Sequence, residues 1–126
     1  MNVEEIIQKT VNETVLKLKV AGLMKDNNKT AYQKTEELLR NYYAISISGD
    51  PAAEKMVMQI ESALRSIQDD DYYDVILLYY LENHTRDYIA DYYDTSPTTI
   101  SRNKTRLIKK LSAVLFSDDY IKQLYC

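Results

Sequence analysis

Residues that cross-link a chain or turn it sharply are scarce in this sequence. Its 126 residues include two glycines, two prolines and a single cysteine, Cys126. One cysteine cannot form an intrachain disulfide, which favours an intracellular setting. Hydrophobic residues make up 45% of the chain, enough to bury a core, and the scarcity of glycine and proline favours helix throughout. We therefore expect an all-α protein.

The residue sets that catalyse reactions or bind metals are also missing. His84 is the one histidine, and it cannot readily complete a Ser/His/Asp set or support a tyrosine nucleophile. There is no glycine-rich phosphate loop, no cysteine pair and no His-Glu metal motif, and Glu36 and Glu37 are predicted on the solvent side of a helix. The acidic run 69–71 suits a cation, but it also precedes a predicted helix, whose first amides it can cap. We expect no enzymatic activity, no metal and no cofactor.

Three amphipathic helices are predicted in the first half of the chain. Apolar residues recur at helical spacing over 3–24, 30–47 and 51–67. The second helix ends at a Ser-Gly pair, after which Asp50 and Pro51 supply a cap and a first-position proline. We expect the first helix to pack against the second; its pairing with a second copy of the chain is the alternative.

A helix over 72–81, with the sequence YYDVILLYYL, is apolar on nearly all sides. Such a segment needs neighbours on more than one side. We expect it to form a central pillar, followed by a corner at 82–84. A last short helix is predicted over 120–124.

The stretch 85–111 predicts two helices joined by a short turn. The turn ends at Ser96, which caps the second helix ahead of Pro97. In the first helix the small Ala90 faces inward beside Ile89, where two crossing helices approach closely. A turn of three or four residues between such helices is typical of a helix-turn-helix, whose second helix enters the major groove of DNA.

Positive charge concentrates on the second of these helices. Residues 96–111 hold five cations and no acid, on a chain with a net charge of −3, so the remaining residues sum to −8. A basic helix on an acidic protein marks a localised site for a polyanion, with the solvated face of a core helix as the alternative. At about 100° per residue, its buried face is predicted to hold Ile100, Leu107, Ile108 and Leu111, with Lys104 among them.

The opposite, polar face supplies the candidates for DNA contacts. Arg102 suits a bidentate contact with guanine, and its hydroxyl-bearing neighbours suit shorter polar or methyl contacts with bases. Arg86, Arg106 and Lys109 are predicted to bind phosphates, with the aspartates of 69–70 as alternative partners for Arg86. The predicted DNA-binding set is Arg86, Ser96, Thr98, Thr99, Ser101, Arg102, Thr105, Arg106 and Lys109.

Residues 73–111 resemble region 4 of the bacterial sigma factors. That region typically has a hydrophobic helix ending in a Leu-rich Tyr-Leu pattern, a Thr or Ser, a Glu-Ile-Ala helix, a Gly turn, a Ser and a recognition helix that begins with Val. Matching positions are YDVILLYYL at 73–81, Thr85, Ile89-Ala90, Ser96, Thr99-Ile100 and 107–111. Asp94 replaces the turn Gly, which aspartate tolerates because it visits the left-handed region, and Tyr88 replaces the Glu. The promoter-melting region of sigma factors has no counterpart here.

The sequence is more similar to small phage regulators of the ArpU type. The resemblance implies a sequence-specific, double-stranded DNA-binding regulator that activates phage late genes for packaging and lysis with host RNA polymerase. It implies a helical accessory or oligomerisation segment at 1–48, a sigma region 4-like domain at 49–117 and a short helix at 118–126. The polar N-terminus and the absence of a long apolar run predict no signal peptide and no membrane contact. We expect a cytoplasmic protein of a bacterial host cell, with homo-oligomerisation through the N-terminal helices.

Two other functions fit parts of the pattern. Small phage terminase subunits also combine a helix-turn-helix with oligomerisation helices and recognise packaging sites, although they usually place the DNA-binding unit first. A module that mimics sigma region 4 could bind RNA polymerase without touching DNA. The acidic N-terminal half favours such a protein partner, but the basic helix would then be unexplained.

Overall fold

The computed structural model describes residues 29–116, and every regular element in this range is helical. The all-α prediction is confirmed for this part of the chain, whereas the helices predicted over 3–24 and 120–124 lie outside the described residues. The elements are α2 (Ala31–Arg40), α3 (Tyr42–Ser46), α4 (Pro51–Ser66), α5 (Tyr73–Ile76), the π-helical turn η1 (Leu77–Leu81), α6 (Arg86–Tyr92) and α7 (Pro97–Leu115).

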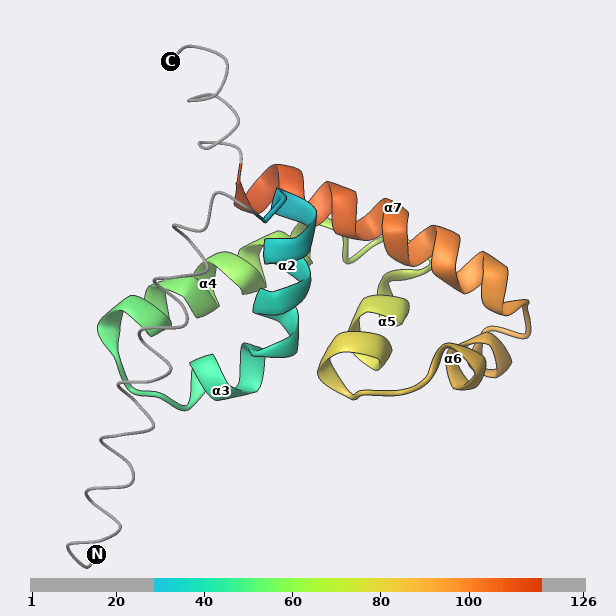
Figure 1. Ribbon diagram of the computed structural model, residues 1–126, viewed down its shortest axis with the longest axis horizontal. Coiled ribbons are helices and arrows are strands. Elements are labelled where there is room, and N and C mark those ends of the chain that lie inside the picture. Colours follow the sequence, from blue (N-terminus) through green and yellow to red (C-terminus); the bar gives the residue numbers. More distant parts are fainter. Residues whose placement is uncertain (1–28, 117–126) are drawn as a thin grey trace, which may run out of the picture.

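The long helix α7 is the element on which the others are assembled (Figure 1). α2 and α4 pack against its C-terminal part, α5 and α6 pack against its N-terminal part, and α3 packs on α4. Each end of α7 therefore belongs to a different group of helices.

Oxygen-bearing side chains cap four of the described helices, α2, α4, α6 and α7. The Asp50 carboxylate accepts a hydrogen bond from the backbone N–H of Ala52 at 3.2 Å. The Ser96 hydroxyl accepts one from the backbone N–H of Thr99, also at 3.2 Å. Thr30 and Thr85 cap α2 and α6 in the same way. Gly49 has φ of 73°, a left-handed conformation that glycine adopts without steric cost. The predicted helix end at the Ser-Gly pair and the two predicted cap-proline starts are thus confirmed.

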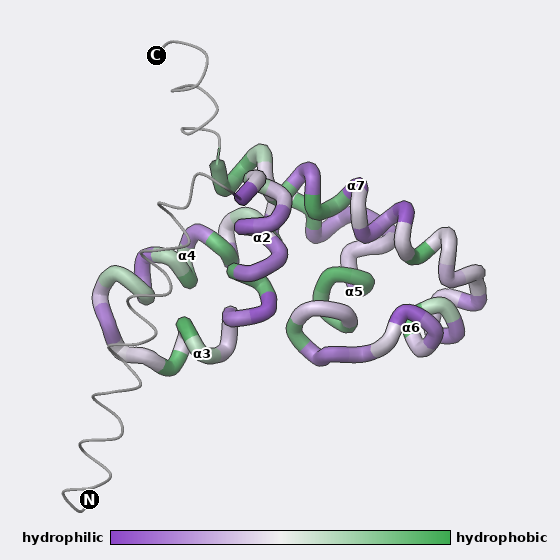
Figure 2. Tube along the Cα trace, in the orientation of Figure 1, coloured by the Kyte–Doolittle hydropathy of each residue, from purple (hydrophilic) through white to green (hydrophobic). Residues whose placement is uncertain are grey.

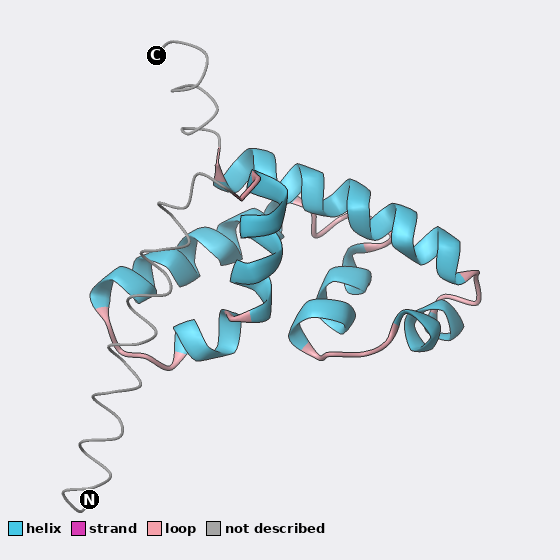
Figure 3. Cartoon of the chain, in the orientation of Figure 1, coloured by secondary structure: helices cyan, strands magenta, loops and turns pink. Residues whose placement is uncertain are grey.

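The single helix predicted over 30–47 is interrupted at Asn41 (Figure 3). The Asn41 side chain donates to the Glu37 carbonyl at 2.7 Å, and its backbone N–H bonds to the same carbonyl at 3.0 Å. Asparagine side chains that compete for backbone carbonyls favour helix ends over helix interiors. The prediction of one continuous helix was therefore wrong, and α3 leaves the line of α2 to pack on α4.

The central pillar predicted over 72–81 is confirmed as α5 and η1. In the π-helical turn, the Glu82 N–H donates to the carbonyl of Leu77, five residues earlier, at 3.0 Å. Val75 is buried in a small cluster with α6 and the start of α7, whereas Ile76 and Tyr80 belong to a larger cluster with α2, α4 and the rest of α7. Figure 2 shows the hydrophobic character of this segment. The pillar links the two clusters.

The larger cluster crosses the boundary predicted at residue 48. Leu38 and Leu39 of α2 lie in it with Leu107 and Leu111 of α7, and each of the four is at most 1% exposed. Residues 29–48 therefore share a core with the segment predicted to bind DNA. The predicted buried face of α7 is also confirmed, since Ile100, Leu107, Ile108 and Leu111 are all buried.

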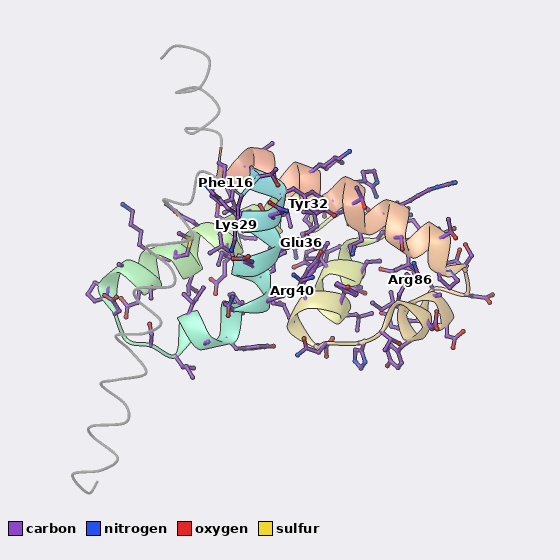
Figure 4. The ribbon with its side chains drawn as sticks, viewed as in Figure 1. Lys29, Tyr32, Glu36, Arg40, Arg86 and Phe116 are labelled. Atoms are coloured by element: carbon purple, nitrogen blue, oxygen red, sulfur yellow. The ribbon has the colours of Figure 1, made fainter. Side chains whose placement is uncertain are left out.

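Polar contacts fix α2 against α7 and the pillar. Thr35 Oγ1 and Ser112 Oγ lie 2.9 Å apart, both buried between α2 and α7. The Tyr80 hydroxyl donates to the Glu36 carboxylate at 2.7 Å, and Arg40 pairs with the same carboxylate at 3.5 Å (Figure 4). The prediction that Glu36 faces solvent was wrong: its side chain is 18% exposed because α2 packs directly over η1.

Candidate nucleic-acid interface

The turn between α6 and α7 consists of residues 93–96. Asp94 has φ of 52°, so aspartate does occupy a left-handed position in this turn, as predicted. The Ser96 Oγ accepts the Thr99 N–H at 3.2 Å and lies 2.9 Å from Thr99 Oγ1. The two side chains therefore close the first turn of α7, and both belong to the predicted DNA-binding set.

α6 and α7 are held together by the smaller apolar cluster. Ile89 and Ala90 of α6 pack with Ile100 of α7 and Val75 of the pillar, and all four are buried. Ala90 is 3% exposed, so the two helices meet where the side chain is small. This cluster fixes the angle at which α7 leaves the turn.

One long face of α7 points into solvent. Thr98, Arg102 and Lys109 are exposed and Thr105 is half-buried, and at about 100° per residue they fall on one side of the helix. From Thr98 to Lys109 this face extends about 16 Å along the helix axis. The structure thus brings together four of the nine predicted residues in a single acid-free row.

Arg106 has a different environment from the rest of the predicted set. Its Nη1 and Nη2 donate to the two Asp70 carboxylate oxygens at 2.7 and 2.9 Å, and its Nε and Nη2 donate to Asn103 Oδ1 at 3.3 and 3.1 Å. Hydrogen bonds from the guanidinium lower the pKa of Asp70 to about 2. Asp70 also accepts the Tyr72 N–H at 2.9 Å in the turn before α5, but α5 itself begins at Tyr73 without a side-chain cap, so the capping predicted for the acidic run stops short of the helix. Arg106 therefore ties α7 to the loop before the pillar.

The remaining cations of α7 divide into one packed and three free side chains. Lys104 Nζ lies 4.4 Å from the centre of the Tyr79 ring, a cation–π contact that accommodates a charge on the buried side of the helix. Arg102, Lys109 and Lys110 are exposed and form no ion pair within residues 29–116. Their charges are available to an external anion.

Arg86 joins this surface from the start of α6. Its Nη1 donates to Ser101 Oγ at 3.1 Å, so two predicted residues from different helices are in direct contact. The predicted alternative, an ion pair with Asp69 or Asp70, is not formed; Asp70 is bound to Arg106 instead. Figure 4 shows Arg86 between α6 and α7.

No family model, no curated protein and no solved structure matches this chain. Within residues 29–116, no three His, Cys, Asp or Glu side chains gather as a metal site would require. No helix in that same range is long and apolar enough to span a bilayer. The function of the chain is therefore inferred from the arrangement of α6 and α7.

Sequence reasoning missed two features of this surface. Asn103 holds Arg106 by hydrogen bonds, and Lys110 is exposed beside the predicted row. Lys110 could have been found from its charge in the acid-free segment. The role of Asn103 depends on the position of Arg106, which local patterns do not specify.

Proposed function

We propose that this protein is a sequence-specific double-stranded DNA-binding regulator of transcription, with α6 and α7 as a helix-turn-helix of the sigma region 4 type. One observation carries the proposal. The solvent face of α7 holds an acid-free row from Thr98 to Lys109, with unpaired cations, on a chain whose net charge is −3. A localised positive face on an acidic protein favours a polyanion over non-specific adhesion.

Each residue of the row has a role that suits its position. Arg102 lies near the N-terminal part of α7 and is free to place its guanidinium against a guanine edge. Thr98 and Thr105 flank it and suit shorter contacts with bases. Lys109 lies at the C-terminal end of the row and Arg86 lies on its flank beside Ser101, and both suit phosphates. Arg106 is left out of the phosphate set, because Asp70 and Asn103 occupy four of its donors.

The regulatory task follows from the resemblance to ArpU-type phage regulators. One module of this size buries about 600–1,000 Å² on DNA, so useful affinity requires a second copy or help from a larger complex. We propose that the protein activates phage late genes together with RNA polymerase. This part of the proposal rests on residues 73–111 and their similarity to sigma region 4.

The proposal is tested by DNA retention on fragments upstream of the neighbouring operons, titrated with salt. The chain is compared with the double variant Arg102→Ala/Lys109→Ala and with Lys55→Ala, which removes an exposed cation of α4. We expect fragment-selective binding that the double variant loses and the control keeps. If the wild-type protein retains all fragments alike or none, the proposal fails. Polymerase binding without DNA, or recognition of a packaging site, would then be the function to test.

A further inference from the structure

A cleft of about 350 Å³ opens where the start of α6 meets η1 and the first half of α7. Its lining comes from described residues of three segments and is Tyr79, Thr85, Arg86, Ile100, Ser101 and Lys104. These residues supply two cations and three hydroxyls, but no carboxylate. A cleft of this composition selects an anion.

The two cations of the cleft come from different elements and neither has a carboxylate partner within residues 29–116. Arg86 reaches from α6 and donates to Ser101 Oγ at 3.1 Å, which uses one of its five donors. Lys104 comes from α7, with its Nζ 4.4 Å from the centre of the Tyr79 ring. The ring and Ile100 provide an apolar wall, which reduces the screening of charge by water.

The cleft is continuous with the solvent face of α7. At about 100° per residue, Ser101 lies about 60° around the helix from Thr98, and Lys104 lies about 60° beyond Ser101. A ligand that covers Thr98 and Arg102 therefore has one of its flanks beside Ser101. Arg86, labelled in Figure 4, lies on this flank.

We propose that this cleft holds one backbone phosphate of the bound DNA, with Arg86 and Lys104 as its two positive partners and the Ser101 hydroxyl as a donor. The inference rests on the proposed function and adds to it a phosphate site at the junction of α6 and α7. It also gives Lys104 a function, since an uncharged residue would pack against Tyr79 at lower desolvation cost. Because the phosphate contacts both helices, it fixes the register of α7 in the groove.

The test measures duplex affinity as a function of salt for Lys104→Met, Arg86→Gln and the charge-preserving Lys104→Arg, with Lys55→Met as the matched control. We expect each neutral variant to weaken binding by on the order of tenfold on every sequence and to flatten the log–log salt slope by about 1. Lys104→Arg should retain most of the slope, and the control should retain all of it. Circular dichroism and thermal unfolding identify any variant that has lost its fold.

A neutral methylphosphonate scanned along the duplex locates the contact. At one position, the methylphosphonate should weaken DNA binding by the wild-type protein but have no further effect on binding by Lys104→Met. Unchanged salt slopes in both neutral variants would overturn the inference, even with fragment-selective binding by the wild type intact. If the variants then differed in binding inorganic phosphate, the cleft would serve a free phosphate ester instead of DNA. Failure of the wild type to bind any duplex would refute the proposed function itself.

Discussion

Asp70 and Arg106 form a bidentate ion pair that joins the loop before α5 to the middle of α7. The Nη1–Oδ2 and Nη2–Oδ1 distances are 2.7 and 2.9 Å, and the Asp70 side chain is 18% exposed. The pair spans 36 residues of sequence. It anchors the proposed recognition helix to the pillar on the side opposite the cleft.

We expect Asp70→Asn to lower the free energy of unfolding by about 1 kcal/mol at pH 7, the range of a well-formed, partly exposed pair. Hydrogen bonds from Arg106 lower the pKa of Asp70 from its ordinary 3.8 to about 2. The pair therefore stabilises the fold above pH 3.8, and this contribution is lost as pH falls toward 2. Urea unfolding should show a difference between wild type and variant at pH 6 that shrinks as the pH falls and is largely lost at pH 2. Asp71→Asn, a change at the exposed neighbour, should show no comparable difference.

The same substitution also tests the part that Arg106 plays toward DNA. Asp70→Asn removes a negative charge and releases the guanidinium from its carboxylate. We expect affinity for duplex DNA to rise a fewfold on all sequences, because a freed cation can bind phosphate. Arg106→Gln in the wild-type background should leave the salt slope nearly unchanged. If Arg106→Gln instead lowered the salt slope by about 1, Arg106 would bind a DNA phosphate, as the sequence predicts.

Ala90→Leu should separate α6 from α7. Ala90 is 3% exposed among Ile89, Ile100 and Val75, where added volume has no space. Overpacking of this kind costs about 1–3 kcal/mol, and we expect DNA affinity to fall because Arg86 moves with α6. Ala113→Leu, on the exposed side of α7, is the matched control. Equal thermal stability of the two variants would contradict the close approach of α6 and α7 at Ala90.

Tyr80→Phe should show the contribution of the hydroxyl that joins the pillar to α2. Burial, together with the hydrogen bond to Glu36, raises the pKa of Tyr80 well above its ordinary value. The folded chain keeps this hydroxyl protonated, so its contribution is present below pH 10 and is lost as pH rises further and the unfolded chain ionises. We expect a loss of about 1–2 kcal/mol at pH 7 and a shallower fall in stability above pH 10. Tyr43→Phe, which alters an exposed ring, is the control. If Tyr80→Phe were as stable as this control, the hydrogen bond from Tyr80 to Glu36 would make no contribution to stability.

Local signals in the sequence predict much of the fold. The caps at Asp50 and Ser96, the left-handed Asp94 and the apolar face of α7 each depend on residues a few positions apart. The break at Asn41 was missed because its signal, one side chain competing for a carbonyl, is weak beside the helical periodicity around it. Local chemistry therefore fixes most helix boundaries but not every one.

Contacts between distant segments were beyond sequence reasoning. Asp70 was predicted as a cap and Arg106 as a phosphate ligand, yet nothing local pairs residues 36 positions apart. Glu36 was predicted in solvent because its own helix gives no sign that Tyr80 lies over it. The cleft at Lys104 was missed for the same reason, since its walls come from three segments. Of the predicted site, only the acid-free row on α7 could be predicted from the sequence, because all of its residues lie on one helix.

The most direct measurement is the discrimination between a selected duplex and one with a single G·C pair changed, for wild type, Arg102→Ala and Lys109→Ala. We expect Arg102→Ala to lose about 1–3 kcal/mol of discrimination at one position. Lys109→Ala should keep the discrimination, weaken both duplexes alike and flatten the salt slope by about 1. If Arg102→Ala weakened both duplexes equally at every position tested, the face of α7 would not read bases, and the central claim would be wrong.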